Sequence, residues 1–192
     1  MKRTSKLLRL LGCLLILCSL VTLLSTRFLA ARARTEAART ALRISTIIPE
    51  RTSGTMDNYS SMEMPVLQVD GKDYVALLAV PSLGVELPVA GSWKAEDVTN
   101  QPCRFQGTVY DGSLVVGGFD QQGQFDFLDR IEIGTLVTVT DMNGAEFSYR
   151  VDRVDRAQRA EAGILVPEEA GLTLFVRDAY SLEYLIVRCV TP

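Results

Sequence analysis

TLVTVTDMNGAEFSYRV, residues 135–151, has the pattern of two β-strands joined by a tight turn. The first strand is rich in β-branched residues, which favour extended backbone. Asn143-Gly144 can supply the positive φ angles that a short hairpin turn needs. After the turn, Phe147, Tyr149 and Val151 alternate with polar residues, so one face of the second strand is expected to be buried. The segment therefore predicts an antiparallel hairpin within a β-domain.

Similar short, apolar and β-branched segments occur on both sides of this hairpin. We expect further strands at residues 74–80, 84–90, 113–118, 172–176 and 184–190. Helical material is scant there: a turn or two near residues 125–130 and a crossover over residues 156–170. About eight short strands separated by turns predict an all-β domain, a closed or nearly closed β-barrel over residues 66–192.

The N-terminal part is of a different kind. Leu10–Thr26 is an uncharged, mainly apolar run of seventeen residues, which as a helix would span roughly 26 Å, just enough for the core of a bilayer. We therefore expect a short cytoplasmic segment at 1–9, a transmembrane anchor at 10–27, and a juxtamembrane helix and linker at 28–65. The alternative is a cleaved signal peptide, since Ala31-Arg32-Ala33 resembles a cleavage site.

Charge is divided unevenly along the chain. Residues 1–65 hold 10 basic and 4 acidic residues (+6), whereas residues 66–192 hold 10 basic and 19 acidic residues (-9). The acidic domain lacks the basic face that nucleic-acid binding requires, so no nucleic-acid partner is expected. The arginines after the apolar run are suited to anionic headgroups at a membrane surface. We expect a single-pass protein of the cell membrane whose C-terminal domain lies outside the cytoplasm.

Residue types that carry chemistry are few. The chain has no histidine, which excludes Ser-His, Cys-His and His-metal chemistry. An acidic set matches no Ca²⁺-loop spacing and is expected to be a solvated face: Asp120, Asp126, Asp129 and Glu132. We therefore expect neither a metal nor another cofactor.

The four cysteines form two pairs by location. Cys13 and Cys18 lie inside the apolar run, and Cys103 and Cys189 belong to the β-domain. For the second pair the sequence leaves two alternatives, a disulfide between Cys103 and Cys189 or two buried free thiols.

Five stretches of the β-domain together resemble the sortases, the membrane-anchored cysteine transpeptidases of Gram-positive bacteria, and most of all a class B-like subgroup. They follow one another in family order: DYVALLAVPSLGVELPVAGSW (73–93), QPCRFQGTVY (101–110), SLVVGGFD (113–120), FDFLDRIEIGTLVTVTDMNGAEFSYRV (125–151) and LTLFVRDAYSLEYLIVRC (172–189). The resemblance implies a sortase-like closed barrel preceded by one membrane helix.

The resemblance also implies where catalytic residues would lie. In the family, a histidine, a cysteine at the end of the penultimate strand and an arginine opening the last strand perform acyl transfer on LPxTG-like sorting signals. VVGGF places Phe119 at the histidine position, LTLFVR places Arg177 at the cysteine position, and YLIVRC places Tyr184 at the arginine position. None of the three can perform its counterpart's chemistry, because phenylalanine carries no proton, a guanidinium is no nucleophile and a phenol carries no positive charge.

We therefore expect a catalytically degenerate sortase-like protein that acts as a binding or accessory factor in surface-protein or pilus anchoring. Its expected partner is a sorting segment of a surface protein or pilin, or an active sortase, and Arg177 is the candidate groove-binding residue. The first alternative is an active transpeptidase or hydrolase that uses Cys189 or Cys103. The second is an envelope protein without a groove ligand, in which Arg177 pairs with Asp178 or Glu183.

Overall fold

The computed structural model describes residues 2–54, 63–158, 171–177 and 183–192. One long helix, α1 (Lys2–Ile47), is followed by a β-domain with two short helical turns on its surface and one brief α-helix, α2 (Ala95–Val98). The strands are β1 (Thr52–Ser53), β2 (Leu67–Val69), β3 (Lys72–Val80), β4 (Val85–Ala90), β5 (Cys103–Gln106), β6 (Ser113–Phe119), β7 (Leu136–Asp141), β8 (Ala145–Ala157), β9 (Gly171–Arg177) and β10 (Tyr184–Val190). The helical turns are η2 (Pro81–Leu83) and η3 (Leu128–Arg130).

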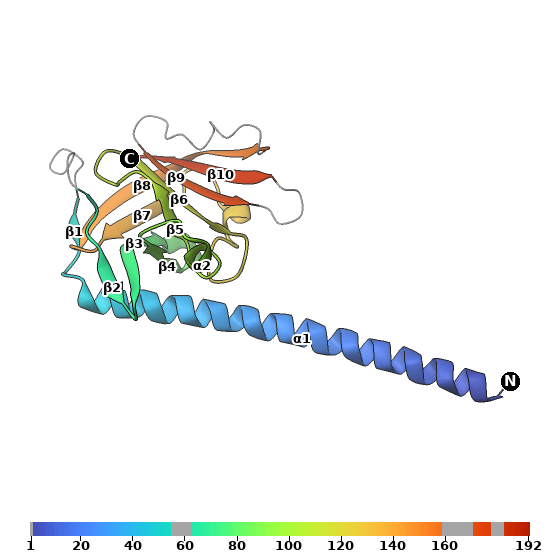
Figure 1. Cartoon of the computed structure of the whole chain (residues 1–192). Coiled ribbons are helices and arrows are strands. Elements are labelled where there is room, and N and C mark those ends of the chain that lie inside the picture. Colours follow the sequence, from blue (N-terminus) through green and yellow to red (C-terminus); the bar gives the residue numbers. More distant parts are fainter. Residues whose placement is uncertain (1, 55–62, 159–170, 178–182) are drawn as a thin grey trace.

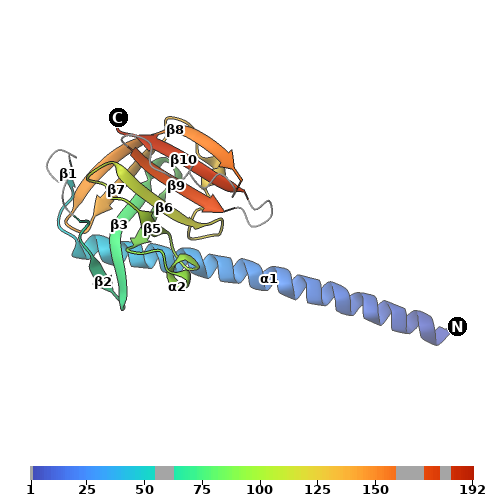
Figure 2. The ribbon, with the colours of Figure 1, turned by 45° about the horizontal axis from the view of Figure 1, so that its top comes forward.

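Eight of these strands close into a barrel. In the described part of the chain the order is β8-β10-β9-β6-β5-β4-β3, and β7 pairs with both β3 and β8 to complete the ring. The short strands β1 and β2 are added to its outside, on β8 and β3. The expected barrel of about eight strands is confirmed, and Figures 1 and 2 show it from two directions.

Strand alternation divides the side chains into an interior and an exterior set. Inward positions of β6, β9 and β10 belong to one core with side chains from the other strands: Leu114, Val116, Leu172, Leu174, Val176, Leu185, Val187 and Cys189. Because successive side chains point to opposite faces, Gly117, Phe119, Phe175, Arg177, Tyr184 and Ile186 lie on the outer face. Phe119, Arg177 and Tyr184 therefore belong to the outer surface of the barrel and not to its core.

The hairpin at 135–151 forms as its sequence predicts. β7 and β8 pair antiparallel, and Gly144 at the turn has a φ of 85°. Asp141 fixes the turn, because its Oδ1 accepts hydrogen bonds from the backbone N–H groups of Asn143 and Ala145, each at 2.9 Å. Its other oxygen accepts from the buried Tyr110 hydroxyl at 2.7 Å, so the carboxylate is satisfied inside the barrel.

The helix α1 includes both the residues expected as the membrane anchor and those expected as the juxtamembrane helix. It is continuous, and its last turns pack along the barrel (Figure 1). Ala41, Ile44 and Ile48 recur every three or four residues and are buried against Tyr74 and Met142, among other residues. The packing extends the β-domain with a helix that the sequence assigned to the membrane-proximal region.

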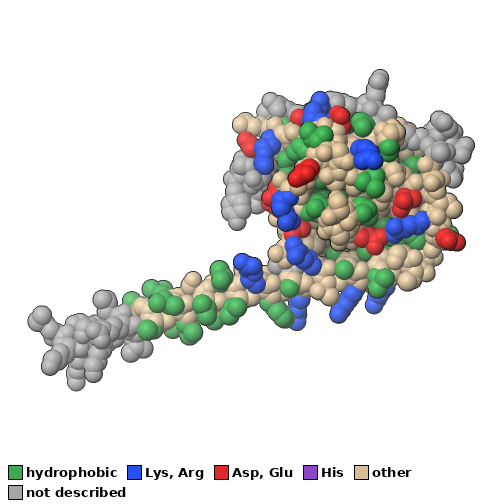
Figure 3. Space-filling model, turned by 180° about the vertical axis from the view of Figure 1, so that it is seen from behind, with side chains coloured by type: hydrophobic (Ala, Val, Ile, Leu, Met, Phe, Trp, Pro, Cys, Tyr) green, Lys and Arg blue, Asp and Glu red, His purple; other side chains and the backbone are tan. Residues whose placement is uncertain are grey.

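The first part of α1 has no protein cover. From Leu11 onward the helix is long and apolar enough to cross a membrane, and its apolar side chains are exposed as far as Leu29. Figure 3 shows hydrophobic side chains there, followed by Lys and Arg side chains that project away from the barrel. Arg32 and Arg39 are exposed on this part of α1, and Arg43 pairs with Asp70 of the β2–β3 turn at 2.6 Å. The expected membrane segment thus coincides with a helix suited to be one.

The expected linker also contains structure. Within residues 49–65, β1 pairs in parallel with β8, Thr52 opposite Ala145. Arg51 forms ion pairs with Glu86 and Glu146, so this segment is fastened to two strands of the barrel. Residues 55–62 of the linker, and all but the first three residues of the crossover expected at 156–170, lie outside the described residues.

Candidate functional site

Phe119, Arg177 and Tyr184 lie side by side on three neighbouring strands. β6 and β9 pair in parallel with Phe119 opposite Arg177, and β9 and β10 pair antiparallel with Tyr184 opposite Arg177. Adjacent strands stand about 4.8 Å apart, so the three backbones are immediate neighbours. The fold thus brings Phe119 beside Arg177 and Tyr184, which follow it by 58 and 65 positions in the sequence.

Phe119 ends β6 and faces outward into a small apolar cluster. It packs against Ala90, Val98 and Cys103, where β4, α2 and β5 meet. Its backbone N–H donates to Gln124 Oε1 at 2.9 Å, and Gln124 Nε2 donates to the Val98 carbonyl at 3.1 Å. Gln124 is buried, so the strand end and α2 are held together by one satisfied amide. Phe119 therefore makes this end of the outer face apolar.

Arg177 and Tyr184 give the same end of the face its polar groups. Both are half-buried. Among the described residues the Arg177 guanidinium forms no hydrogen bond or ion pair, so Glu183 is not its partner, and Asp178 lies outside those residues. A fixed cation beside a phenol offers donors to a carboxylate or a peptide carbonyl. This end of the face offers no thiol, and Phe119 offers no imidazole.

An aromatic cluster of Trp93, Phe105, Phe175 and Tyr184 continues the face away from Arg177. The Phe175 ring centre lies 5.5 Å from that of Trp93, 5.4 Å from that of Phe105 and 6.0 Å from that of Tyr184. Trp93 and Phe105 meet edge-to-face at 5.4 Å, and both are partly exposed. These spacings are those of favourable ring pairs.

Gly117 makes room for this cluster. A Cβ on Gly117 would stand 2.3 Å from the Phe175 ring and 2.5 Å from the Trp93 ring, so the rings lie directly on the backbone of β6. Beside the cluster is a cavity of about 350 Å³, whose lining includes Trp93, Arg104, Phe105 and Glu63. The sequence alone does not indicate that these rings meet. The Gly117-Gly118 pair was its one local signal, since a glycine inside a strand often marks a close approach.

The thiols of the β-domain do not belong to this face. Cys189 points into the barrel core and is 2% exposed, while Cys103 is 0% exposed. Burial raises the pKa of each thiol to about 12. A thiol that is buried and protonated is a poor nucleophile.

Of the two alternatives for Cys103 and Cys189, the structure holds free thiols and not the disulfide. β5 and β10 are separated by β6 and β9. Three strand spacings amount to roughly 14 Å along the sheet, whereas a disulfide needs Cα atoms within about 7 Å.

The loop after Phe119 connects this site to α1. Gly123 packs so closely that a Cβ there would lie 2.8 Å from the backbone of Ala33, and its φ is 84°. Three residues further on, Asp126 accepts a hydrogen bond from Arg34 at 2.6 Å. The position of α1 is therefore coupled through one short loop to the end of β6.

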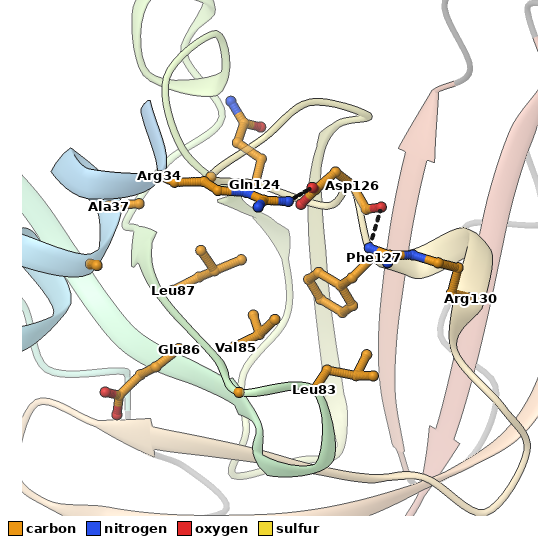
Figure 4. A pocket seen from close by; sticks show the side chains of 13 residues that line it. Arg34, Ala37, Leu83, Val85, Glu86, Leu87, Gln124, Asp126, Phe127 and Arg130 are labelled. Carbon is orange, nitrogen blue, oxygen red and sulfur yellow. Dashed lines mark hydrogen bonds and ion pairs between the residues drawn. The ribbon is translucent and has the colours of Figure 1, made fainter. Parts of the chain in front are cut away.

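The Arg34–Asp126 pair also borders a cavity of about 420 Å³ between α1 and the barrel. Figure 4 shows Val85, Leu87 and Phe127 pointing into it, with Arg34, Asp126 and Arg130 along one side. Asp126 therefore links α1 to the loop after β6 through its ion pair with Arg34.

The other residues of the acidic set do not gather around one site. Asp129 pairs with its neighbour Arg130 at 3.5 Å, and Glu132 is exposed. In the ranges that the structure describes, no group of three potential metal ligands occurs.

Comparisons with known proteins agree with this architecture. The family model described as the sortase domain matches residues 78–180. A sortase D5 transpeptidase of Clostridium perfringens is similar in structure, with a TM-score of 0.55 and 16% identity over 62% of this chain and 79% of that one. Sortase A of Corynebacterium diphtheriae matches with a TM-score of 0.56 and 15% identity over 85% and 84%.

Sortase C1 of Streptococcus suis matches with a TM-score of 0.54 and 19% identity over 62% and 73% of the two chains. Identities this low show the fold alone. A search of curated proteins found no match. The expected class B-like character stays a prediction.

Proposed function

The chain belongs to the sortase family, and from this premise we propose that it binds an extended segment of a surface protein or pilin without transferring it. One observation carries the proposal. Phe119 and Arg177, the last residues of β6 and β9, stand in register with Tyr184, the first residue of β10, where the family's histidine, cysteine and arginine are expected. Acyl transfer in the family uses a cysteine thiolate and a histidine, and neither is present among these three side chains.

The buried thiols support the same conclusion. Transfer through Cys189 would require a side chain of the barrel core to reach a peptide on the surface. Cys103 is equally buried, and its Sγ donates to the Gln101 carbonyl at 3.5 Å. With a pKa of about 12, each thiol is protonated at neutral pH. These facts weigh against the alternative of an unorthodox active site.

Binding is supported by what the face does offer. Arg177 supplies donors without a protein partner among the described residues, and the aromatic cluster supplies partly exposed rings beside it. A peptide that lays apolar side chains on Trp93 and Phe105 and one carbonyl or carboxylate on Arg177 would use both. The apolar part of α1 would hold this face outside the cell membrane, where surface proteins are anchored.

Peptide binding with a matched pair of variants tests this proposal. A fluorescent LPxTG-type peptide titrated into the full chain should bind with saturation, and Arg177→Ala should weaken the affinity about tenfold, the loss of one charged hydrogen bond. Arg150→Ala is the control, because Arg150 is an exposed arginine of β8 whose bond goes to the Gly134 carbonyl. Equal affinity of the Arg177→Ala variant and the unaltered chain would contradict the binding role.

Partner identity needs a separate experiment. Crosslinking in the native cell envelope, followed by purification of the full chain, should recover a surface protein, a pilin or an active sortase. Recovery of none of these, together with unchanged interactions of the Arg177→Ala variant, would favour an envelope protein without a groove ligand.

A further inference from the structure

A second cavity, of about 430 Å³, lies where α1 passes α2 and the loop after β6. Its two walls differ in chemistry. Leu29, Ala33 and Ala37 of α1 form an apolar wall. The opposite wall is built mainly from amide side chains, those of Asn100, Gln101, Gln121 and Gln122. This cavity is on the other side of α1 from the one in Figure 4 and shares only Ala37 with it.

Gln101 leaves an unused donor in the amide wall. Its side chain is 6% exposed, and its Oε1 accepts a hydrogen bond from the Tyr74 hydroxyl at 3.0 Å. Its Nε2 is buried and has no partner among the described residues. A buried amide N–H without an acceptor costs free energy, so an acceptor placed in the cavity would be stabilised there.

Two opposite charges line the same cavity without neutralising each other. Lys72 begins β3 and Glu36 lies on α1. Neither forms a hydrogen bond or an ion pair with any described residue. The cavity thus offers a cation on the barrel side, an anion on the helix side and a neutral donor at Gln101. A ligand that satisfies all three carries an anion, an ammonium group and an oxygen acceptor within one small head.

We propose that this cavity binds a zwitterion of the phosphoethanolamine type. Its phosphate pairs with Lys72, its ammonium donates to Glu36, and a phosphate or ester oxygen accepts from Gln101 Nε2. The cavity begins at Leu29, where the continuous exposed apolar stretch of α1 from Leu11 ends, so a lipid headgroup can reach it from a membrane around that stretch. A free solute of the same chemistry can reach it from the other side. The site is independent of peptide binding on the outer face.

Calorimetric titration of the full chain in neutral detergent tests the proposal. Glycerophosphoethanolamine should bind with saturation, and glycerophosphocholine should bind at least about tenfold more weakly, since its quaternary ammonium has no N–H to donate to Glu36. Glu36→Gln and Lys72→Gln should each weaken binding of the ethanolamine probe by a similar factor. Glu96→Gln and Lys94→Gln, at exposed residues outside the cavity, are the controls. Equal affinity for both probes, or unchanged binding in the two cavity variants, would overturn the proposal.

A second experiment distinguishes a membrane lipid from a free solute as the source of the ligand. The full chain is placed in nanodiscs that contain equal amounts of phosphatidylethanolamine and phosphatidylcholine. Native mass spectrometry then releases the chain and measures its mass together with any lipids that stay bound. Retention of phosphatidylethanolamine that is lost in Glu36→Gln indicates a lipid headgroup. Binding of the soluble probe without lipid retention indicates a free zwitterion, and absence of both contradicts the site. Peptide binding at Arg177 serves as the folding control in each variant.

Discussion

Gly117 determines where the aromatic rings of the outer face can lie. Without a side chain on Gly117, the Phe175 and Trp93 rings rest on β6 and form a continuous apolar surface that ends at Arg177. With a larger residue the rings would have to leave the strand. The local shape of the site therefore depends on a residue that contacts no ligand directly.

Gly117→Ala should displace the rings and lower the free energy of unfolding by about 1–3 kcal/mol, the usual cost of overpacking. The emission spectrum of Trp93, the one tryptophan of the chain, reports ring position, and denaturant unfolding reports stability. Gly91→Ala is the matched control, because its Cβ would meet Val75 at 3.2 Å and only a small shift is needed. An unchanged Trp93 spectrum in Gly117→Ala would show that the rings are placed differently.

The cysteines give a second prediction for single residues. In a Cys13→Ser/Cys18→Ser chain, a thiol reagent at pH 8 should label neither Cys103 nor Cys189 while the protein is folded. Both should react in denaturant without a reductant, because the two thiols are free. Labelling in the folded state would contradict their burial, and no labelling in denaturant would indicate a disulfide.

The same thiols imply a direction of pH dependence. Their pKa rises from an ordinary 9.0 to about 12 on folding, so the folded state disfavours the thiolate. Their contribution to stability is therefore complete below pH 9 and is lost as the pH rises toward 12. Replacing Cys189 by Ala should flatten the loss of stability measured by denaturant unfolding between pH 9 and pH 11. An equal slope in both proteins would contradict the raised pKa.

The site was predictable from the sequence only in part. The positions of Phe119, Arg177 and Tyr184 follow from short local patterns, VVGGF, LTLFVR and YLIVRC, that fix where each strand ends. The aromatic cluster was missed, since Trp93, Phe105 and Phe175 come from distant segments and nothing local states that their rings meet. Cavities between α1 and the barrel were equally hidden, because they depend on how two elements pack.

At the scale of elements, α1 has two parts with different surroundings. Its apolar first part is exposed, and its last turns are packed against β3 and β4 through residues spaced three or four apart. Ile44 is 0% exposed in this interface, whereas Leu42, two residues earlier, is 65% exposed. The spacing of Ala41, Ile44 and Ile48 was visible in the sequence, but the surface that covers them was not, because the barrel is assembled from segments far along the chain.

Ile44→Ala should weaken the docking of α1 by about 2–4 kcal/mol, through lost burial and the cavity left behind. Leu42→Ala should have little effect, since the Leu42 side chain is exposed. Trypsin cleavage after Arg39 and Arg43 measures docking, and it should accelerate in Ile44→Ala alone. Equal cleavage rates in the two variants would indicate that the helix is not held by this interface.

The hairpin and the barrel show which larger features a sequence reveals. The β7–β8 hairpin was predictable because its turn residues and its alternation are adjacent in the chain. The number of short strands predicted only the fold class, a closed or nearly closed β-barrel, and not which strands pair to close it. The parallel pairing of β6 with β9, which brings Phe119 beside Arg177, joins segments with the whole β7–β8 hairpin between them. Local propensity does not encode such a crossover, so only the family pattern indicated it.

At the scale of the whole molecule, the chain is a closed barrel of the sortase family that packs against the last turns of a long helix, with Phe119, Arg177 and Tyr184 on its outer face. On that face Arg177 lies between Phe119 and Tyr184, and the barrel buries both of its own thiols. The helix would set the distance of this face from a membrane. These features support the proposal that this barrel recognises a peptide segment without transferring it.

Intact-mass spectrometry of the full chain, after incubation with an LPxTG-type peptide and an amine acceptor, tests this account most directly. The sortase D5 transpeptidase of Clostridium perfringens, incubated in parallel with a peptide that it accepts, is the positive control. We expect the mass of the chain to stay unchanged and no transfer product to form. A thioester adduct on Cys103 or Cys189, or any peptide joined to the acceptor, would contradict the account.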